Sequence, residues 1–321
     1  MISTGPNGHS SSDLEWRKIR YDAITSLKSF NLPDDLQTPS LPSALTKFLD
    51  VSSGAEYDIA TLGRIVEVDP GMTMDLLKWV NVAAAGTERP IKSATAALIR
   101  MGVPKARNYL IAAGMRGATL AYESRLVNHR NFWNESLRRA IFAQQTAKVW
   151  NFDADLAFIG GLLQDFALPG LTNQFDTQYV EFLKDAAPDG VLLTDWERNT
   201  FGWDHAAVGA YVAHQWNMPE DLLCAILFHH RMDLTLQATG GDLPQLFPVA
   251  LAGLLPDQLQ QLQQVPDGIQ RLLDADAKSS VFRLGELCDA VDSQLAILVE
   301  GDDAPLRLAP AVQNAREIVS A

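Results

Sequence analysis

The chain has 321 residues, of which 47% are hydrophobic and 20% charged. This composition supplies enough apolar material for a folded interior, and a chain of this length usually divides into two cores. Lys and Arg total 26 against 39 Asp and Glu, so the net charge of −13 excludes the overall positive field that nonspecific nucleic-acid binding needs. Two cysteines, Cys224 and Cys288, are too few for a disulfide framework, and we expect both to be inert buried thiols.

The sequence contains no run of about 18 uncharged apolar residues, so we expect no membrane-spanning helix. Residues 1–13 are rich in Ser and Gly and lack an apolar signal segment, which predicts a mobile tail. A cytoplasmic setting is the expectation that follows.

Helix signals follow one another through the first part of the chain. Apolar residues recur at helical spacing over 14–30, which predicts an opening helix. Asp58 and Ser93 are typical N-caps of two later helices, and Gly102 is placed to end the second of them. Pro104 suits the first turn of the helix after that.

A second series of helices follows. Apolar spacing predicts a helix over 131–150, and Asp153 is a suitable start for the next one. Within that next helix, Gly160 and Gly161 favour close helix packing rather than phosphate binding. The sequence lacks good strand alternation and hairpin turn signals, which predicts an all-α fold.

Four side chains in this second series are candidates for chemistry. Asp165 is the only acidic residue in the apolar run 158–168, and burying a carboxylate without a partner is costly. His205 stands in the first turn of its helix, and we expect His229 and His230 to end a later one. Side chains at helix ends converge in the metal sites of helical bundles, and these oxygen and nitrogen ligands would suit Fe, Mn or Zn.

The same histidines also have a structural interpretation. A His pair at a helix C-terminus is stabilised by the helix dipole, and His205 would fill a polar gap. His214 follows His205 by nine residues and therefore points to the opposite face of the helix, away from any such site. The spacing of these histidines matches no compact metal motif such as H-E-x-x-H.

Other catalytic signatures are missing from the sequence. It contains no phosphate-binding P-loop, no dinucleotide-binding glycine motif and no G-x-S-x-G nucleophile elbow. Arg100, Lys105 and Arg107 form a small basic edge at the start of a helix. This edge would suit a phosphate or an acidic peptide, but a solvated helix face is the more ordinary interpretation.

Several motifs, in order, resemble those of HDOD domains. The sequence D-P-G-M-T at 69–73, followed by L-L at 76–77 and by Asn81, is similar to their D-P-x-L-T…LL…N-S-A signature. The resemblance covers about residues 35–235. In the second series of helices the similar ranges are 132–133, 160–165, 201–209, 216–220 and 229–230.

HDOD domains are relatives of the HD phosphohydrolases, which bind one or two metals through a first His, a His-Asp doublet, later histidines and a final Asp. The resemblance places Glu135 where the first His belongs and Gln164 where the His of the doublet belongs. It implies a degenerate pocket formed by Glu135, Gln164, Asp165, His205, His229 and His230. The final Asp aligns near 254–256, where none stands; Asp257 and Asp289 are nearby candidates.

The loss of these ligands should weaken the binding of a divalent ion, which in such enzymes lowers the pKa of bound water and neutralises phosphate charge. The resemblance therefore implies a non-catalytic signalling module of bacterial type, with no catalytic residue and no bound metal. Its partner would be a signalling protein or a small ligand, bound by default in the cleft between the two helical blocks.

The predicted organisation has four parts. A tail (1–13) precedes an N-terminal helical subdomain (14–127), and an HD-like helical subdomain (128–300) precedes a C-terminal tail or helix (301–321). The main alternative function is a metal-dependent phosphohydrolase with a rearranged ligand set, namely Glu135, Asp165, His205, His229 and His230. A third possibility is a phosphate- or nucleotide-binding sensor without turnover.

Overall fold

The computed structural model describes residues 11–28, 30, 32, 36–38, 40–54, 56–83, 90–119, 122–232, 245–256, 259, 265–279, 281–299 and 307–320. The regular elements within these ranges are helices and no strand occurs among them, which confirms the predicted all-α class. None of the described helices is both long enough and apolar enough to span a bilayer.

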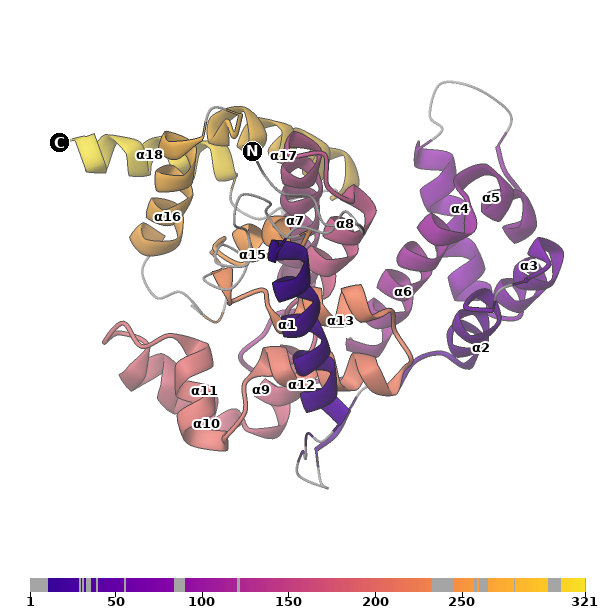
Figure 1. The fold of residues 1–321 in the computed structure, drawn as a ribbon, viewed down its shortest axis with the longest axis horizontal. Helices are drawn as coiled ribbons and strands as arrows, with labels where there is room; N and C mark the ends of the chain where they lie inside the picture. The colour runs from indigo at the N-terminus through magenta and orange to yellow at the C-terminus, as the bar shows by residue number, and fades with distance from the viewer. Residues whose placement is uncertain are drawn as a thin grey trace.

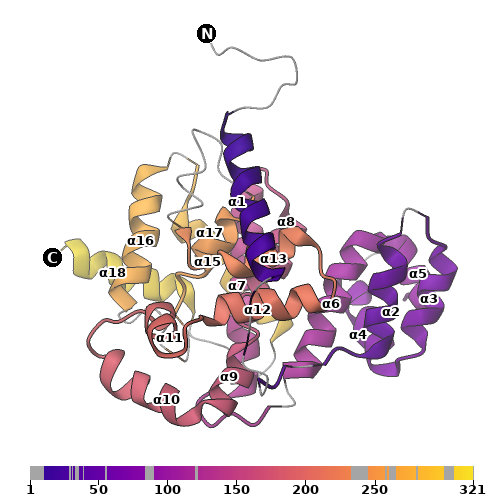
Figure 2. The same ribbon diagram turned by 60° about the horizontal axis from the view of Figure 1, so that its bottom comes forward.

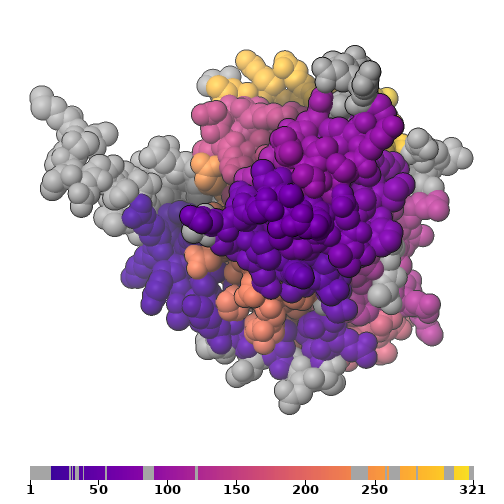
Figure 3. Space-filling model, turned by 90° about the vertical axis from the view of Figure 1, so that its right-hand side faces the viewer, coloured from indigo at the N-terminus to yellow at the C-terminus, as the bar shows by residue number. Residues whose placement is uncertain are grey.

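The first block of helices stands apart from the rest at one side of the molecule (Figure 1), and in Figure 3 this block faces the viewer. Its last helix reaches back to the second block and packs against α8. The helices of this block are α2 (Ser43–Ser52), α3 (Ile59–Glu67), α4 (Pro70–Ala83), α5 (Ala94–Met101) and α6 (Val103–Thr119).

The second block is larger and is built around α7, which packs against α8, α15 and α17 (Figure 2). A short π-helical turn, η1, interrupts it after α10. Its elements are α7 (His129–Val149), α8 (Ala154–Leu163), α9 (Leu168–Gln174), α10 (Asp176–Glu181), η1 (Phe182–Ala186), α11 (Leu193–Phe201), α12 (His205–Gln215), α13 (Glu220–Leu227), α15 (Phe247–Ala252), α16 (Val265–Lys278), α17 (Leu284–Leu298) and α18 (Leu308–Ser320).

The predicted helix starts are confirmed by their capping bonds. The side chains of Asp58, Ser93 and Asp153 each accept hydrogen bonds from backbone N–H groups in the first turn of α3, α5 and α8. These caps are local features, because a carboxylate or hydroxyl needs only the next three residues to satisfy free N–H groups. Gly102 follows α5 with a φ of 81°, a conformation that glycine adopts without steric cost.

One expected helix boundary is wrong, and another is shifted. We expected His229 and His230 to end a helix, but α13 ends at Leu227 and both histidines lie in the turn that follows it. The opening helix α1 (Ser11–Lys28) begins at Ser11, three residues before the predicted helix start, and the tail limit at residue 13 stays a prediction. Residues 1–10 lie outside the described part, as do Asp257 and residues 300–306 of the expected C-terminal boundary.

The first helix packs on the second block, although it belongs to the range expected to form the N-terminal subdomain (14–127). Trp16 meets Phe228 edge to face at 5.9 Å between ring centroids, and Arg20 forms ion pairs with Glu220 at 3.0 Å and with Asp221 at 2.7 Å. Figure 2 shows α1 crossing α13 and α12. The subdomain limits at 127 and 128 themselves remain predictions.

Both cysteines are fully buried and free, as expected. Burial raises the pKa of Cys224 and of Cys288 to about 12, because the thiolate would lose its hydration in an apolar interior. Both thiols are therefore unreactive at neutral pH.

The two glycines of α8 allow close packing, as predicted. A Cβ atom at Gly161 would lie 2.9 Å from the carbonyl oxygen of Arg139, and one at Gly160 would lie 2.9 Å from the side chains of Ala225 and Val249. Because real Cβ atoms do not approach so closely, glycine at 161 lets α8 lie this near to α7, and glycine at 160 lets it lie this near to α13 and α15.

Gly161→Ala should therefore lower the free energy of unfolding by about 1–3 kcal/mol, since the added methyl group overpacks the contact between α8 and α7. Gly117→Ala is the matched control, because a Cβ there meets nothing within 4 Å. It should raise stability by about 0.4–1 kcal/mol through the unfolded chain. Urea unfolding of both variants provides the measurement, and equal effects would contradict the packing role of Gly161.

Candidate functional site

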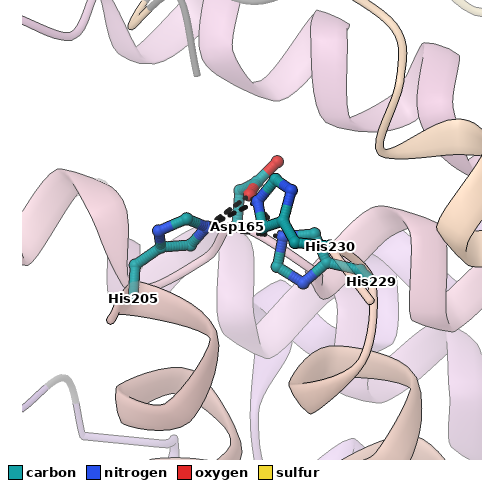
Figure 4. A group of neighbouring side chains, drawn as sticks. All are labelled: Asp165, His205, His229 and His230. Carbon is teal, nitrogen blue, oxygen red and sulfur yellow. Dashed lines mark hydrogen bonds and ion pairs between the residues drawn. The ribbon is translucent and has the colours of Figure 1, made fainter. Parts of the chain in front are cut away.

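Four side chains from separate segments converge in the second block. Asp165 lies two residues after α8, His205 opens α12, and His229 and His230 follow α13. One ligand atom from each lies within 4.8 Å of those of the other three (Figure 4). Asp165, His205 and His229 are at most 1% exposed, whereas His230 is partly exposed. The four side chains therefore lie together, although three of them are in or beside turns after helices rather than within helices.

A second buried carboxylate orients His205. Glu197, on α11, lies 2.7 Å from Nδ1 of His205 and also accepts the backbone N–H of His205 at 2.9 Å. The hydroxyl of Tyr179 donates to the other oxygen of Glu197 at 2.7 Å. These contacts use Nδ1 of His205 and turn its Nε2 toward Asp165.

His229 is oriented by the backbone. Its Nδ1 lies 2.6 Å from the carbonyl oxygen of Ile226, and because a carbonyl only accepts, Nδ1 carries the proton. The Nε2 atom of His229 then faces inward, 3.2 Å from Oδ1 of Asp165. The Nε2 atom of His205 lies 3.4 Å from the same oxygen and 3.0 Å from Nε2 of His230.

Arg139 completes the environment of Asp165. Its Nη1 donates to Oδ2 of Asp165 at 2.8 Å, and its Nη2 donates to the carbonyl oxygen of Leu255 at 3.0 Å. Gln164 also donates to Oδ2, at 3.2 Å. The guanidinium is 2% exposed, so a full positive charge is buried against the carboxylate.

The charges of this site shift two pKa values. Burial by itself raises the pKa of Asp165, but Arg139 and the two histidines outweigh it and hold that pKa well below its ordinary value. Burial likewise lowers the pKa of His205, but Glu197 and Asp165 outweigh it and raise that pKa to about 10. At neutral pH, Asp165 is therefore charged and His205 is protonated.

Other residues expected at the site lie elsewhere or differ in role. Within the described ranges, the group of four converging ligands does not contain Glu135, which is partly exposed on α7 one turn before Arg139. Asp289 is exposed on α17 and lies outside this group as well. His214 also stays out of the group, as its helical phase predicted.

Sequence reasoning missed Arg139 and Glu197, although a signal for each was present. Arg139 follows the buried Phe132 by seven residues, and Glu197 follows the buried Leu193 by four. Both spacings place a charged residue on the apolar face of its helix. A charge at such a position needs a buried partner.

The arrangement offers ligands for one divalent ion, once His205 loses its proton, but not for two. Three imidazole nitrogens and Oδ1 of Asp165 converge, and Oδ1 has no hydrogen bond of good geometry within the described residues. The outer nitrogens of His205 and His229 are fixed by a carboxylate and a carbonyl, as is usual for metal ligands. On the other side, Arg139 already occupies Oδ2, so this carboxylate has no second oxygen for another ion.

A cavity of about 500 Å³ lies apart from these four side chains. It is found where the segment before α2 meets the end of α6 and Tyr122, near the junction of the two blocks. Gln37, Thr38 and Ser40 line its polar side, and Leu41 and Pro42 contribute apolar surface.

The sequence profile of the HDOD domain family matches residues 38–232. An uncharacterized protein of Treponema pallidum is 26% identical over 219 residues, a match that covers 67% of this chain and 42% of that protein. The chain thus matches less than half of this relative's length.

Two solved structures have a similar fold. A "Putative phosphohydrolase" from Shewanella amazonensis SB2B is 19% identical with a TM-score of 0.57, and the match covers 97% of this chain and 95% of that one. An HDOD domain protein with unknown function from Geobacter sulfurreducens is also 19% identical, with a TM-score of 0.55 and coverage of 96% and 98%. At these identities the similarity concerns the fold alone.

The raised pKa of His205 predicts a specific dependence of stability on pH. A group whose pKa is raised on folding stabilises the protein fully below its unfolded value of about 6.5, and this contribution is lost as the pH rises toward about 10. The free energy of unfolding should therefore fall over this range by at least about 1.4 kcal/mol through His205, the value of one pKa unit.

Glu197→Gln should make this fall shallower, because the amide keeps the shape of the side chain but removes the charge next to Nδ1 of His205. Urea unfolding at several pH values compares the two proteins, and groups that titrate in both cancel in the difference. Equal slopes for wild type and variant would contradict the assignment.

Proposed function

The chain belongs to the HDOD domain family, and from this premise we propose that it is a non-catalytic signalling module that binds a protein or a small ligand. HDOD domains resemble hydrolases whose reaction depends on metal ions bound by a fuller set of ligands. In this chain the corresponding pocket keeps one carboxylate and three histidines.

The ion pair between Arg139 and Asp165 carries the proposal. A hydrolytic metal centre needs its carboxylate for the ion and an open position for water. Here the carboxylate is neutralised by a buried guanidinium at 2.8 Å, and His205 is held protonated between Asp165 and Glu197. A protonated nitrogen has no lone pair for a metal, so the site is occupied by its own hydrogen bonds and ion pairs.

The burial of the pocket supports the same conclusion. Asp165, His205 and His229 are at most 1% exposed, so a phosphoester substrate would have to displace packed side chains to reach them. The cavity lined by Gln37, Thr38 and Tyr122 is the more accessible place for a small ligand. It lies near the junction of the two blocks, and its lining residues come from the segment before α2, the end of α6 and Tyr122.

A metal-dependent phosphohydrolase is the second candidate, and the four converging ligands favour it. Asp165, His205, His229 and His230 would hold the ion, once His205 loses its proton. The ion would supply Lewis acidity and a nucleophilic water when bound. Glu135, which the rearranged ligand set included, lies outside the converging group of described residues. A sensor that binds a phosphate or nucleotide without turnover would use the cavity instead of these ligands.

Elemental analysis of the purified protein separates the first two candidates. The proposal predicts Fe, Mn and Zn well below one ion per chain, and no hydrolysis of phosphodiesters or nucleotides when Mn²⁺ is added. Stoichiometric metal and hydrolytic activity that are both lost in Asp165→Ala would instead favour the enzyme. Absence of hydrolysis by both wild type and Asp165→Ala would support the module. Circular dichroism should show equal helical content for the two proteins, so that both are compared in the folded state.

A thermal-shift screen with nucleotides and cyclic dinucleotides tests ligand binding by the module, because a ligand of the folded state raises the melting temperature.

A further inference from the structure

Arg139 is placed where it can control the affinity of the pocket for cations. It lies on the buried face of α7, which Gly161 of α8 approaches within van der Waals contact. Its two outer nitrogens reach Asp165 and the carbonyl oxygen of Leu255. The Leu255 position is also the region where a final acidic metal ligand was expected from the resemblance, and no Asp stands at 254–256.

The two oxygens of Asp165 have separate roles. Oδ2 accepts from Arg139 and from Gln164, whereas Oδ1 faces Nε2 of His205 at 3.4 Å and Nε2 of His229 at 3.2 Å. One carboxylate therefore lies between a resident organic cation and a set of nitrogen ligands. A metal ion at Oδ1 would share this single negative charge with the guanidinium.

We infer that Arg139 is a built-in competitor of divalent metal ions: its guanidinium takes the place of a second ion on Asp165 and weakens the binding of a first. Two cations on one carboxylate repel each other, and this repulsion is strong in an interior that water screens poorly. The inference deepens the proposed function, because it names what keeps metal out of the pocket.

The neighbouring arginine provides a matched control. Arg138 is also buried, at 4% exposed, and its Nη2 donates to the carbonyl oxygen of Pro256 at 2.8 Å, one residue after the acceptor of Arg139. The two arginines thus tie α7 to the same short segment. The ion pair with Asp165 is formed by Arg139. If the arginines only support the structure, replacing either one should change the affinity for Mn²⁺ in the same way. If Arg139 competes with the ion, only its replacement should raise that affinity.

The test is a calorimetric titration with Mn²⁺ of wild type, Arg139→Gln and Arg138→Gln. We expect Arg139→Gln to bind Mn²⁺ at least about tenfold more tightly than the other two, which is the scale of effects from groups around a metal ligand. Wild type and Arg138→Gln should bind at most one ion per chain. Equal or weaker binding by Arg139→Gln than by Arg138→Gln would overturn the inference.

A variant that does not fold without metal still gives a result. If Arg139→Gln loses its helical circular dichroism signal, the titration is followed as recovery of that signal. Recovery with Mn²⁺ supports the competition, and no recovery overturns it. Phosphodiester hydrolysis by the wild type would contradict the proposed function but leave the competition intact, so the two failures are distinguishable.

Discussion

The buried ion pair between Arg139 and Asp165 is the interaction on which the pocket depends. Each side chain is at most 2% exposed, and either charge without its partner would cost several kcal/mol in this interior. The pair forms because α8 packs against α7 through Gly161, which brings the turn after α8 close to the middle of α7. A backbone carbonyl at Leu255 satisfies a further N–H group of the guanidinium. Helix packing thus fixes the electrostatics of the site.

The remaining polar groups extend this pair into an alternating series of charges. Asp165 faces the protonated His205, which in turn faces Glu197, and the hydroxyl of Tyr179 donates to Glu197. Each buried charge therefore has an opposite charge or a hydrogen-bond donor beside it, as a low-dielectric interior requires. Protein groups thus satisfy Oδ2 of Asp165, and this is the physical basis of the proposed non-catalytic role.

Local features of the structure were predictable and long-range partners were not. Asp58, Ser93 and Asp153 cap helices through contacts within three residues, so sequence patterns were enough. The phases of Arg139 and Glu197 indicated buried charges, but no local pattern tells which partner each finds. The packing of α1 on α12 and α13 could not be predicted from local patterns either, because it joins segments about 200 residues apart.

The protonation state of His205 tests this account most directly. In ¹⁵N-labelled protein near neutral pH, the imidazole signals of His205, assigned with a His205→Gln variant, should report protons on both ring nitrogens. That result would mean that Asp165 and Glu197 hold the ring as a cation and leave it no free lone pair. A ring whose Nε2 carries no proton under the same conditions would contradict the account.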